Sequence, residues 1–483
     1  MRPAKKNLPP VSPPVRSGGG LSWQILLWLV FAGNSLFFLP QCLDRSLAPR
    51  FFFLSLVLLA GLFMVWKSLR EKGDWRLHGF DLLLLVWYGL NLASVAWAFS
   101  WSEAVFYTQK VLLLFVAYWL VRQALICDEG ATRRTLRQAT TLLTFSVCGI
   151  LLVQLAMAAT QHGLDNEKLY NLDWFLFGNK SLTAEFLFFL LIFNVLFLRE
   201  ARGENGEPQG QKTTSSEGVT DSHPLTPPIF WISIALLLAL ILLLQTRTVY
   251  FALFIAAMVY FPVRAWIEPG FADIFKKKIL PGAVIVVGMF IGLLALKGSG
   301  NSLTERLNPL TYLESATANE RRFVWYKTDL LNADHFWLGV GNGSWKFWFP
   351  SKNIQGGYRL QEQNVVFTRV HNDYLEVRSE MGIIGAVLFC IIFGVAFLAA
   401  IRGVRKHEAD IRVRHDLLVL TAGLLGYCII QYFDFPRERI EMQVVLAFFF
   451  AFMAFYTREL WARLPGVFIG KVKAICFGAV IAG

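Results

Sequence analysis

The sequence has few charged residues and few cysteines for its length. Only 17% of its 483 residues are Asp, Glu, Lys or Arg, whereas 55% are hydrophobic and the mean hydropathy is +0.49. This apolar fraction is far above that of a soluble domain, so a soluble globular protein is excluded. Five of the six cysteines lie in apolar runs or on the predicted inner side of a membrane. Cys42 is thus alone outside, which excludes a disulfide framework.

Carboxylate pairs that hold a divalent cation are also scarce. No Asp-x-Asp pair occurs in the chain, and the first predicted outer loop, QCLDRSLAPR, offers only Asp44. Glu376 and Glu380 lie one helical turn apart and fit either a metal pair or a solvated helix face, and the solvated face is the favoured interpretation. The sequence therefore predicts no metal site and no cofactor.

Long apolar runs dominate what is present. Each is close to the roughly 20 residues that an α-helix needs to cross about 30 Å of hydrocarbon, whereas barrel strands are about half as long. The sequence therefore predicts an all-α polytopic membrane protein with about 12 transmembrane helices. No small-residue cleavage site follows the first run, so we expect it to be a membrane span and not a cleavable signal peptide. The predicted spans are residues 21–40, 51–67, 80–99, 104–121, 138–159, 182–198, 229–245, 248–263, 279–296, 382–401, 417–433 and 440–457.

The net charge of +12 reflects membrane topology and gives no reason to expect nucleic acid as a partner. Lys and Arg gather before the first span and after the second, fourth, eighth and tenth spans. By the positive-inside rule, these loops and both termini are cytoplasmic. The basic residues that carry this argument are Lys5, Lys6, Arg16, Lys67, Arg70, Lys72, Arg76, Arg133, Arg134, Arg137, Lys276, Lys277, Lys278, Arg402, Arg405, Lys406, Arg412 and Arg414.

The chain consists of a membrane domain and several segments whose amino-acid composition differs from it. Residues 1–20 form a Pro- and Gly-rich flexible cytoplasmic N-terminus, and residues 200–228 have the composition of a disordered cytoplasmic linker. Residues 297–381, between spans nine and ten, are too long and too aromatic for a simple connection, so a large folded outer loop is predicted. Within it, residues 319–332 read as an amphipathic helix. The transmembrane domain is 21–457, and 458–483 is a cytoplasmic or interfacial tail. The sequence does not determine whether the apolar part of this tail, after Lys473, enters the membrane.

Several cations lie on the outer side, where the positive-inside rule predicts few. Arg247 sits in the tight hairpin QTRTV, Lys180 begins a span in FGNKS, and Arg437 and Arg439 lie in DFPRER. Arginines at a membrane boundary suit a phosphate-bearing lipid head group, because guanidinium is permanently charged and binds phosphate in a bidentate manner. The structural alternative is that such arginines only extend to lipid phosphates.

A histidine accompanies these cations where the outer loop re-enters the membrane. RVHNDYLEVRSEMGIIG, residues 369–385, places His371 and Asn372 before an apolar run. A histidine can take up a proton near neutral pH, so His371 can act as a general base; a structural hydrogen-bonding role is the alternative. Base and cations together describe attack of a hydroxyl on a sugar whose leaving group is a lipid diphosphate.

These residues carry a family resemblance. RVHNDYLEVRSEMGIIGAVLF resembles the signature of the O-antigen ligase and polymerase superfamily: a His-Asn pair, a Leu, then Glu and two spaced glycines that open a membrane helix. The resemblance extends to residues 321–341, with an Arg, a Trp and LGVGNG, and to FGNKS and the Arg247 hairpin. It covers roughly residues 170–455.

The resemblance implies an inverting, metal-independent glycosyltransferase of the GT-C type that acts in lipopolysaccharide biosynthesis. It implies a bacterial inner-membrane location, a periplasmic active site and an undecaprenyl-diphosphate-linked glycan as donor. On matching positions, His371 is the general base and Arg247 and Arg321 bind the diphosphate. Arg322 is the alternative to Arg321 as a diphosphate-binding residue, because either arginine of the doublet can match the family position.

The remaining expected substrate-binding residues match the family less closely. Lys180 replaces the polar neutral residue usual after the Gly-Asn pair, and a lysine there can add to donor binding. Asn372 is expected to orient the loop and Arg437 to add positive charge. The resemblance does not choose the acceptor. Lipid A-core, for a ligase, is the first expectation; a growing glycan, for a polymerase, is the second; a protein acceptor is the third. A polytopic transporter or flippase is the alternative from another class.

Overall fold

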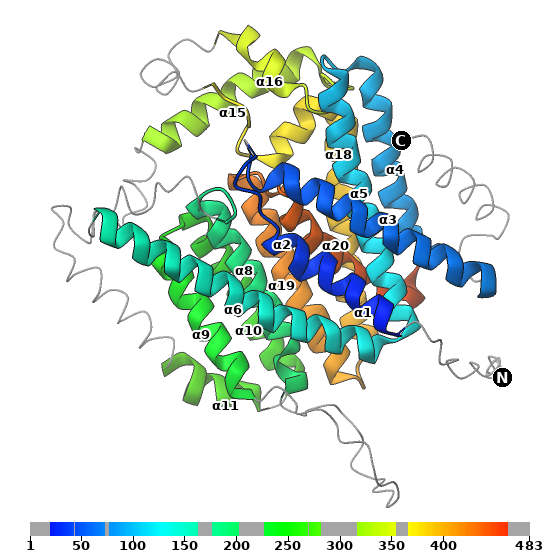
Figure 1. Cartoon of the computed structure of the whole chain (residues 1–483), viewed down its shortest axis with the longest axis vertical. Helices are drawn as coiled ribbons and strands as arrows, with labels where there is room; N and C mark the ends of the chain where they lie inside the picture. Colours follow the sequence, from blue (N-terminus) through cyan, green and yellow to red (C-terminus); the bar gives the residue numbers. More distant parts are fainter. Residues whose placement is uncertain are drawn as a thin grey trace, which may run out of the picture.

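The computed structural model describes residues 20–42, 44–72, 77–162, 176–201, 227–268, 270–281, 316–353 and 366–461. Every regular element within these ranges is a helix, as the sequence predicts. Figure 1 shows α15 (Ala316–Asp334) and α16 (Trp345–Trp348) at one end of the helix bundle and α11 (Phe271–Ile274) at the opposite end. We call the first of these the α15 end.

Eight described helices are long and apolar enough to cross a membrane, which confirms a multi-pass membrane protein. Three shorter apolar helices accompany them, so eleven of the twelve predicted spans fall on described helices. The ninth predicted span, 279–296, lies almost wholly outside the described residues, and the count of 12 stays a prediction. The eight are α3 (Leu47–Lys72), α4 (Gly79–Ser94) with η2 (Val95–Trp97), α5 (Trp101–Cys127), α6 (Glu129–His162), α8 (Lys180–Ala201), α10 (Arg247–Ile267), α18 (Asp373–Lys406) and α19 (Ile411–Phe433). The shorter ones are α1 (Gly20–Trp28) continued by η1 (Leu29–Gly33) and α2 (Asn34–Leu36), α9 (Pro227–Leu244) and α20 (Ile440–Tyr456).

Predictions for the flexible N-terminus, the linker and the C-terminal tail lie almost wholly outside the described residues. Of the long loop 297–381, residues 316–353 and 366–381 are described, and the predicted amphipathic helix over 319–332 is confirmed by α15. This part has a small hydrophobic core of its own. The core consists of Val324, Leu331, Val340, Trp345, Phe349, Phe367 and Val370.

The centre of the bundle is formed by helices that are apolar on every face. All 17 residues of α20 are buried, and α8 is almost as enclosed, whereas only a minority of the residues of α10 are buried. α19 approaches α8 closely because Gly426 has no side chain: a Cβ there would lie 2.2 Å from the ring of Phe188. This packing brings the end of α19 beside the first turns of α8, at the α15 end.

α18 is interrupted at Gly382, and this break explains the glycines of LGVGNG. The backbone of Gly382 has φ 64° and ψ −169°, a conformation that is essentially restricted to glycine. The N–H groups of Val340 and Gly341 donate to the carbonyls of Ser379 and Glu380, at 2.8 and 2.9 Å. The glycine-rich loop LGVGNG is therefore attached to the carbonyl groups that the break releases.

Replacing Gly382 with alanine should destabilise the folded protein. A Cβ at this position would lie 2.1 Å from the Trp337 carbonyl oxygen, and the backbone conformation alone costs about 1–3 kcal/mol for other residues. We expect a clear fall in the thermal unfolding midpoint of Gly382→Ala in detergent. Gly394→Ala in the same helix is the matched control, because no atom lies within 4 Å of its added Cβ. Equal midpoints for the two variants would show that the break is not required.

Candidate functional site

His371 lies at the α15 end, immediately before the first turn of α18. Its backbone has φ 55°, which is uncommon outside glycine. Nδ1 lies 3.5 Å from Oδ1 of Asp434, and the ring packs edge-on against Phe435 at 4.9 Å. The side chain is 38% exposed. A carboxylate therefore lies beside the imidazole on one side, while part of the ring stays open to solvent.

Asn372 caps α18. Its side-chain oxygen accepts a hydrogen bond from the N–H of Leu375 at 3.0 Å, and the residue is buried. The predicted orienting role of Asn372 agrees with this geometry, because the cap determines where α18 starts and hence where His371 is placed.

Arg321 and Arg322 point in different directions. Arg321 donates from Nη1 to the carbonyl of Phe433, and its Nη2 lies 4.0 Å from Oδ2 of Asp434. Arg322 is exposed and donates to the side chain of Asn319 at 2.6 Å. The structure thus brings Arg321, and not Arg322, to the carboxylate that His371 also contacts.

Asp434 joins these groups, although the sequence reading did not select it. It is buried directly after the last residue of α19. Burial alone would raise the pKa of its carboxyl group, but the imidazole of His371 and the guanidinium of Arg321 outweigh burial and lower the pKa below its ordinary value. Asp434 is therefore a carboxylate with a cation and an imidazole on its accessible side.

Lys180 and Arg247 form a second basic group at the α15 end. They are the first residues of α8 and α10, and their positive charges are close enough to repel each other. FGNKS places Lys180 by local rules: Gly178 has φ 97°, and the Asn179 side chain caps α8 by accepting from the N–H of Leu182 at 2.9 Å. Two cations at two helix N-termini favour an anionic ligand.

The two groups are linked through α8, α10 and α19. Phe251, one turn after Arg247, packs edge-on against Phe433 at 6.1 Å, and the carbonyl of Phe433 accepts from Arg321. The structure therefore gathers Lys180, Arg247, Arg321 and His371 at one end of the bundle.

Arg437 lies deeper, among carboxylates. Its Nη2 donates to Glu380 at 2.9 Å and lies 3.4 Å from Glu376, and its backbone N–H donates to Asp373 at 3.0 Å. Glu376 and Glu380 are both buried, so their interpretation as a solvated helix face is wrong. Sequence spacing placed them on one face correctly, but α15 and the loop after α19 cover that face. The geometry of Arg437 favours a bracing role over a substrate contact.

A second ion-pair cluster braces the same loop. Glu438 accepts from Lys110 of α5 and from Arg369, each at 2.5 Å. Burial opposes the charge of Glu438, but the two cations outweigh it and hold the pKa of Glu438 at about 2. Arg439 is likewise engaged with Glu441 at 3.2 Å and donates to Ser46. The loop 434–439 is thereby tied to α5, α18 and α20.

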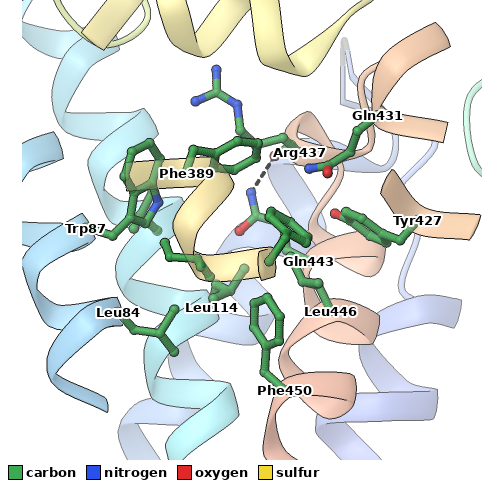
Figure 2. Close-up of a pocket in the computed structure, with 13 residues that line it drawn as sticks. Leu84, Trp87, Leu114, Phe389, Tyr427, Gln431, Arg437, Gln443, Leu446 and Phe450 are labelled. Carbon is green, nitrogen blue, oxygen red and sulfur yellow. Dashed lines mark hydrogen bonds between the residues drawn. The ribbon is translucent and has the colours of Figure 1, made fainter. Parts of the chain in front are cut away.

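A small cavity lies below Arg437, as Figure 2 shows. Its volume is about 40 Å³, and most of its walls are apolar side chains such as Trp87, Phe389 and Phe450. This volume holds water but is far below the several hundred Å³ of a ligand pocket. The cavity is therefore too small for a sugar.

Charges inside predicted spans are the signal that could have identified more of the site. Glu185 in α8 and Lys110 in α5 are buried within apolar runs, where ionisable residues are costly and usually functional. Asp434 offered a weaker signal, because the sequence analysis of DFPRER considered only its two arginines. Among the residues that the structure describes, no three His, Cys, Asp or Glu side chains are grouped to hold a metal ion.

Fold and site define a multi-pass, all-helical membrane protein with basic, acidic and imidazole groups gathered at one end of its bundle. Residues 232–390, about a third of the chain, match the family described as Wzy_C, O-antigen ligase. This match confirms the resemblance to the O-antigen ligase superfamily and supports an O-antigen ligase- or polymerase-type membrane enzyme. No curated protein matches the chain. The matched segment contains Arg247, Arg321 and His371, whereas Lys180 and Asp434 lie outside it.

Proposed function

We propose that the protein is an O-antigen ligase-like glycosyltransferase. It moves a glycan from undecaprenyl diphosphate to a sugar of lipid A-core on the periplasmic face of the bacterial inner membrane. The observation that carries the proposal is the contact of His371 with Asp434, at the bundle end where Arg321, Arg247 and Lys180 also gather. A base and several cations at a membrane boundary are what transfer from a lipid diphosphate needs.

His371 acts as the base. An acceptor hydroxyl loses its proton to the exposed nitrogen of the imidazole, and its oxygen bonds to the anomeric carbon of the donor sugar. Asp434 faces Nδ1, so it orients the ring and stabilises the imidazolium that forms. Attack opposite the leaving group inverts the configuration at the anomeric carbon.

The basic residues act on the leaving group. The bond between the anomeric carbon and the diphosphate oxygen breaks, and its electron pair departs with the diphosphate. Arg321, Arg247 and Lys180 stabilise the negative charge that develops there, so the reaction proceeds without a metal ion. Arg322 is exposed, so its proposed role is to contact the acceptor or the lipid surface and not the diphosphate.

The choice of acceptor is tested by one incubation of the purified full-length protein in detergent. The mixture contains a lipid-diphosphate-linked oligosaccharide, lipid A-core and a candidate protein acceptor, and the three product classes are separated. We expect glycan on lipid A-core. Extension of the lipid-linked glycan would identify a polymerase, and glycosylated protein an oligosaccharyltransferase. Recovery of every component unchanged would contradict an enzyme and favour a transporter or flippase.

A further inference from the structure

Glu185 is a buried acid that the proposed reaction does not use. It lies in α8, five residues after Lys180, in the apolar sequence TAEFLFFLLIF, and its exposed fraction is 0%. Neither carboxyl oxygen receives a hydrogen bond from an N–H or O–H group of the described residues. A carboxylate left in this state in the centre of a membrane protein is strongly unfavourable.

The neighbour that Glu185 does have is another carboxyl group. Its side chain is within hydrogen-bonding range of Asp434, the residue that also contacts His371. A carboxylate has no proton to donate, so this contact becomes a hydrogen bond only when one of the two groups is protonated. Two buried carboxyl groups in contact do not both ionise, because like charges at this distance repel strongly. The pair therefore holds one proton.

The surroundings decide which residue holds that proton. Asp434 has the imidazole of His371 and the guanidinium of Arg321 beside it, and both favour its ionised form. Glu185 is fully buried in α8, and Arg321, Asp373 and Tyr427 also act on it electrostatically. Arg321 favours the ionised form of both acids, but only Asp434 also has His371 beside it, and Asp373 disfavours a negative charge on Glu185.

We propose that Glu185 is a protonated acid that donates its O–H to Asp434 and thereby positions Asp434 against His371. Glu185 is a positioning residue, since it acts on the imidazole through Asp434. Oδ1 of Asp434 faces His371 and Oδ2 faces Arg321, so a third partner from α8 holds the carboxylate plane between them. The pair carries a single negative charge, which suffices to stabilise one imidazolium. The effect on turnover rests on the proposed function; the protonation of Glu185 does not.

The test compares Glu185→Gln with Glu185→Leu in the purified full-length protein. Glutamine keeps a donor for Asp434 without a charge, whereas leucine has a similar volume and no donor. We expect Glu185→Leu to lower glycan transfer about 10- to 100-fold, the size expected from losing a hydrogen bond to a charged group, and Glu185→Gln to restore most of it. Asn194→Leu, nine residues further along α8, is the control for a buried polar loss, because Asn194 bonds Thr144 and not the site.

Infrared spectroscopy gives a readout that is independent of turnover. The carbonyl stretch of a protonated carboxylic acid should be present in the wild-type protein and weaker in both Glu185 variants, and unchanged in Asn194→Leu. An unchanged carboxylic acid band in the Glu185 variants would overturn the proposal, as would glutamine being as damaging as leucine or leucine being harmless. If His371→Ala keeps full transfer, the proposed function loses its base, while the infrared comparison still decides the state of Glu185.

Discussion

His371→Ala should lower glycan transfer by roughly 10² to 10⁴, the usual range for losing a general base, while donor binding persists. The physical reason is the division of roles at the α15 end: the imidazole faces Asp434 and solvent, whereas the diphosphate contacts are assigned to Arg321, Arg247 and Lys180. Donor binding and single-turnover transfer are measured on the same purified variant.

His335→Ala is the matched control for this prediction. His335 belongs to the same loop and packs on Trp348 at 5.0 Å, so its loss removes an imidazole without touching Asp434. We expect transfer close to wild type. If instead His371→Ala loses donor affinity but keeps normal turnover at saturation, His371 is a binding residue. If neither quantity changes, the base lies elsewhere.

Arg321→Lys should be nearly as damaging as Arg321→Ala, with transfer reduced by roughly 10² to 10³ in each. Lysine keeps the charge, but all its donors are on one nitrogen. It does not reproduce the planar fork of Arg321, which reaches the Phe433 carbonyl and Asp434 and is proposed to hold the diphosphate. The same comparison applies to Arg247. Transfer rates at saturating donor and donor affinities together check the prediction.

Arg322→Ala provides the control for Arg321. Arg322 is the neighbouring arginine, but it is exposed and bonded to Asn319, so its loss should change transfer little. A large loss in Arg322→Ala with an active Arg321→Ala would assign the diphosphate contact to Arg322. Full activity of Arg321→Lys and Arg247→Lys would indicate that both arginines only reach lipid phosphates.

Local sequence rules identified the elements and several of their ends. Apolar length predicted the spanning helices, and periodicity predicted α15. The start of a helix at Lys180, predicted because FGNKS enters the sixth span, is confirmed by α8; the structure adds that Asn179 is the cap and that Gly178 has positive φ. These features depend on residues that are close in sequence, so the sequence alone carries the information.

Contacts between distant segments were beyond local rules. The doublet Arg321 and Arg322 was ambiguous because adjacent helix residues point about 100° apart, and only the position of α19 makes one of them an inner residue. Glu376 and Glu380 show the same limit, because a polar helix face reads as solvated until the element that covers it is known. Here the cover includes Arg437, some sixty residues later in the chain.

The sequence by itself determined the membrane class, the helical architecture and the family resemblance, and it selected His371, Arg247 and Arg321 as candidate site residues. These conclusions depend on hydropathy, local spacing and residue chemistry, all of which can be read along one chain. Only the tertiary structure decided that His371 meets Asp434, that Glu185 lies behind that carboxylate, and that Arg437 is enclosed by acids. The reason is that the charge state and partners of a buried group depend on which helices pack around it. That packing depends on close contacts between residues far apart in the sequence, such as Gly426 and Phe188.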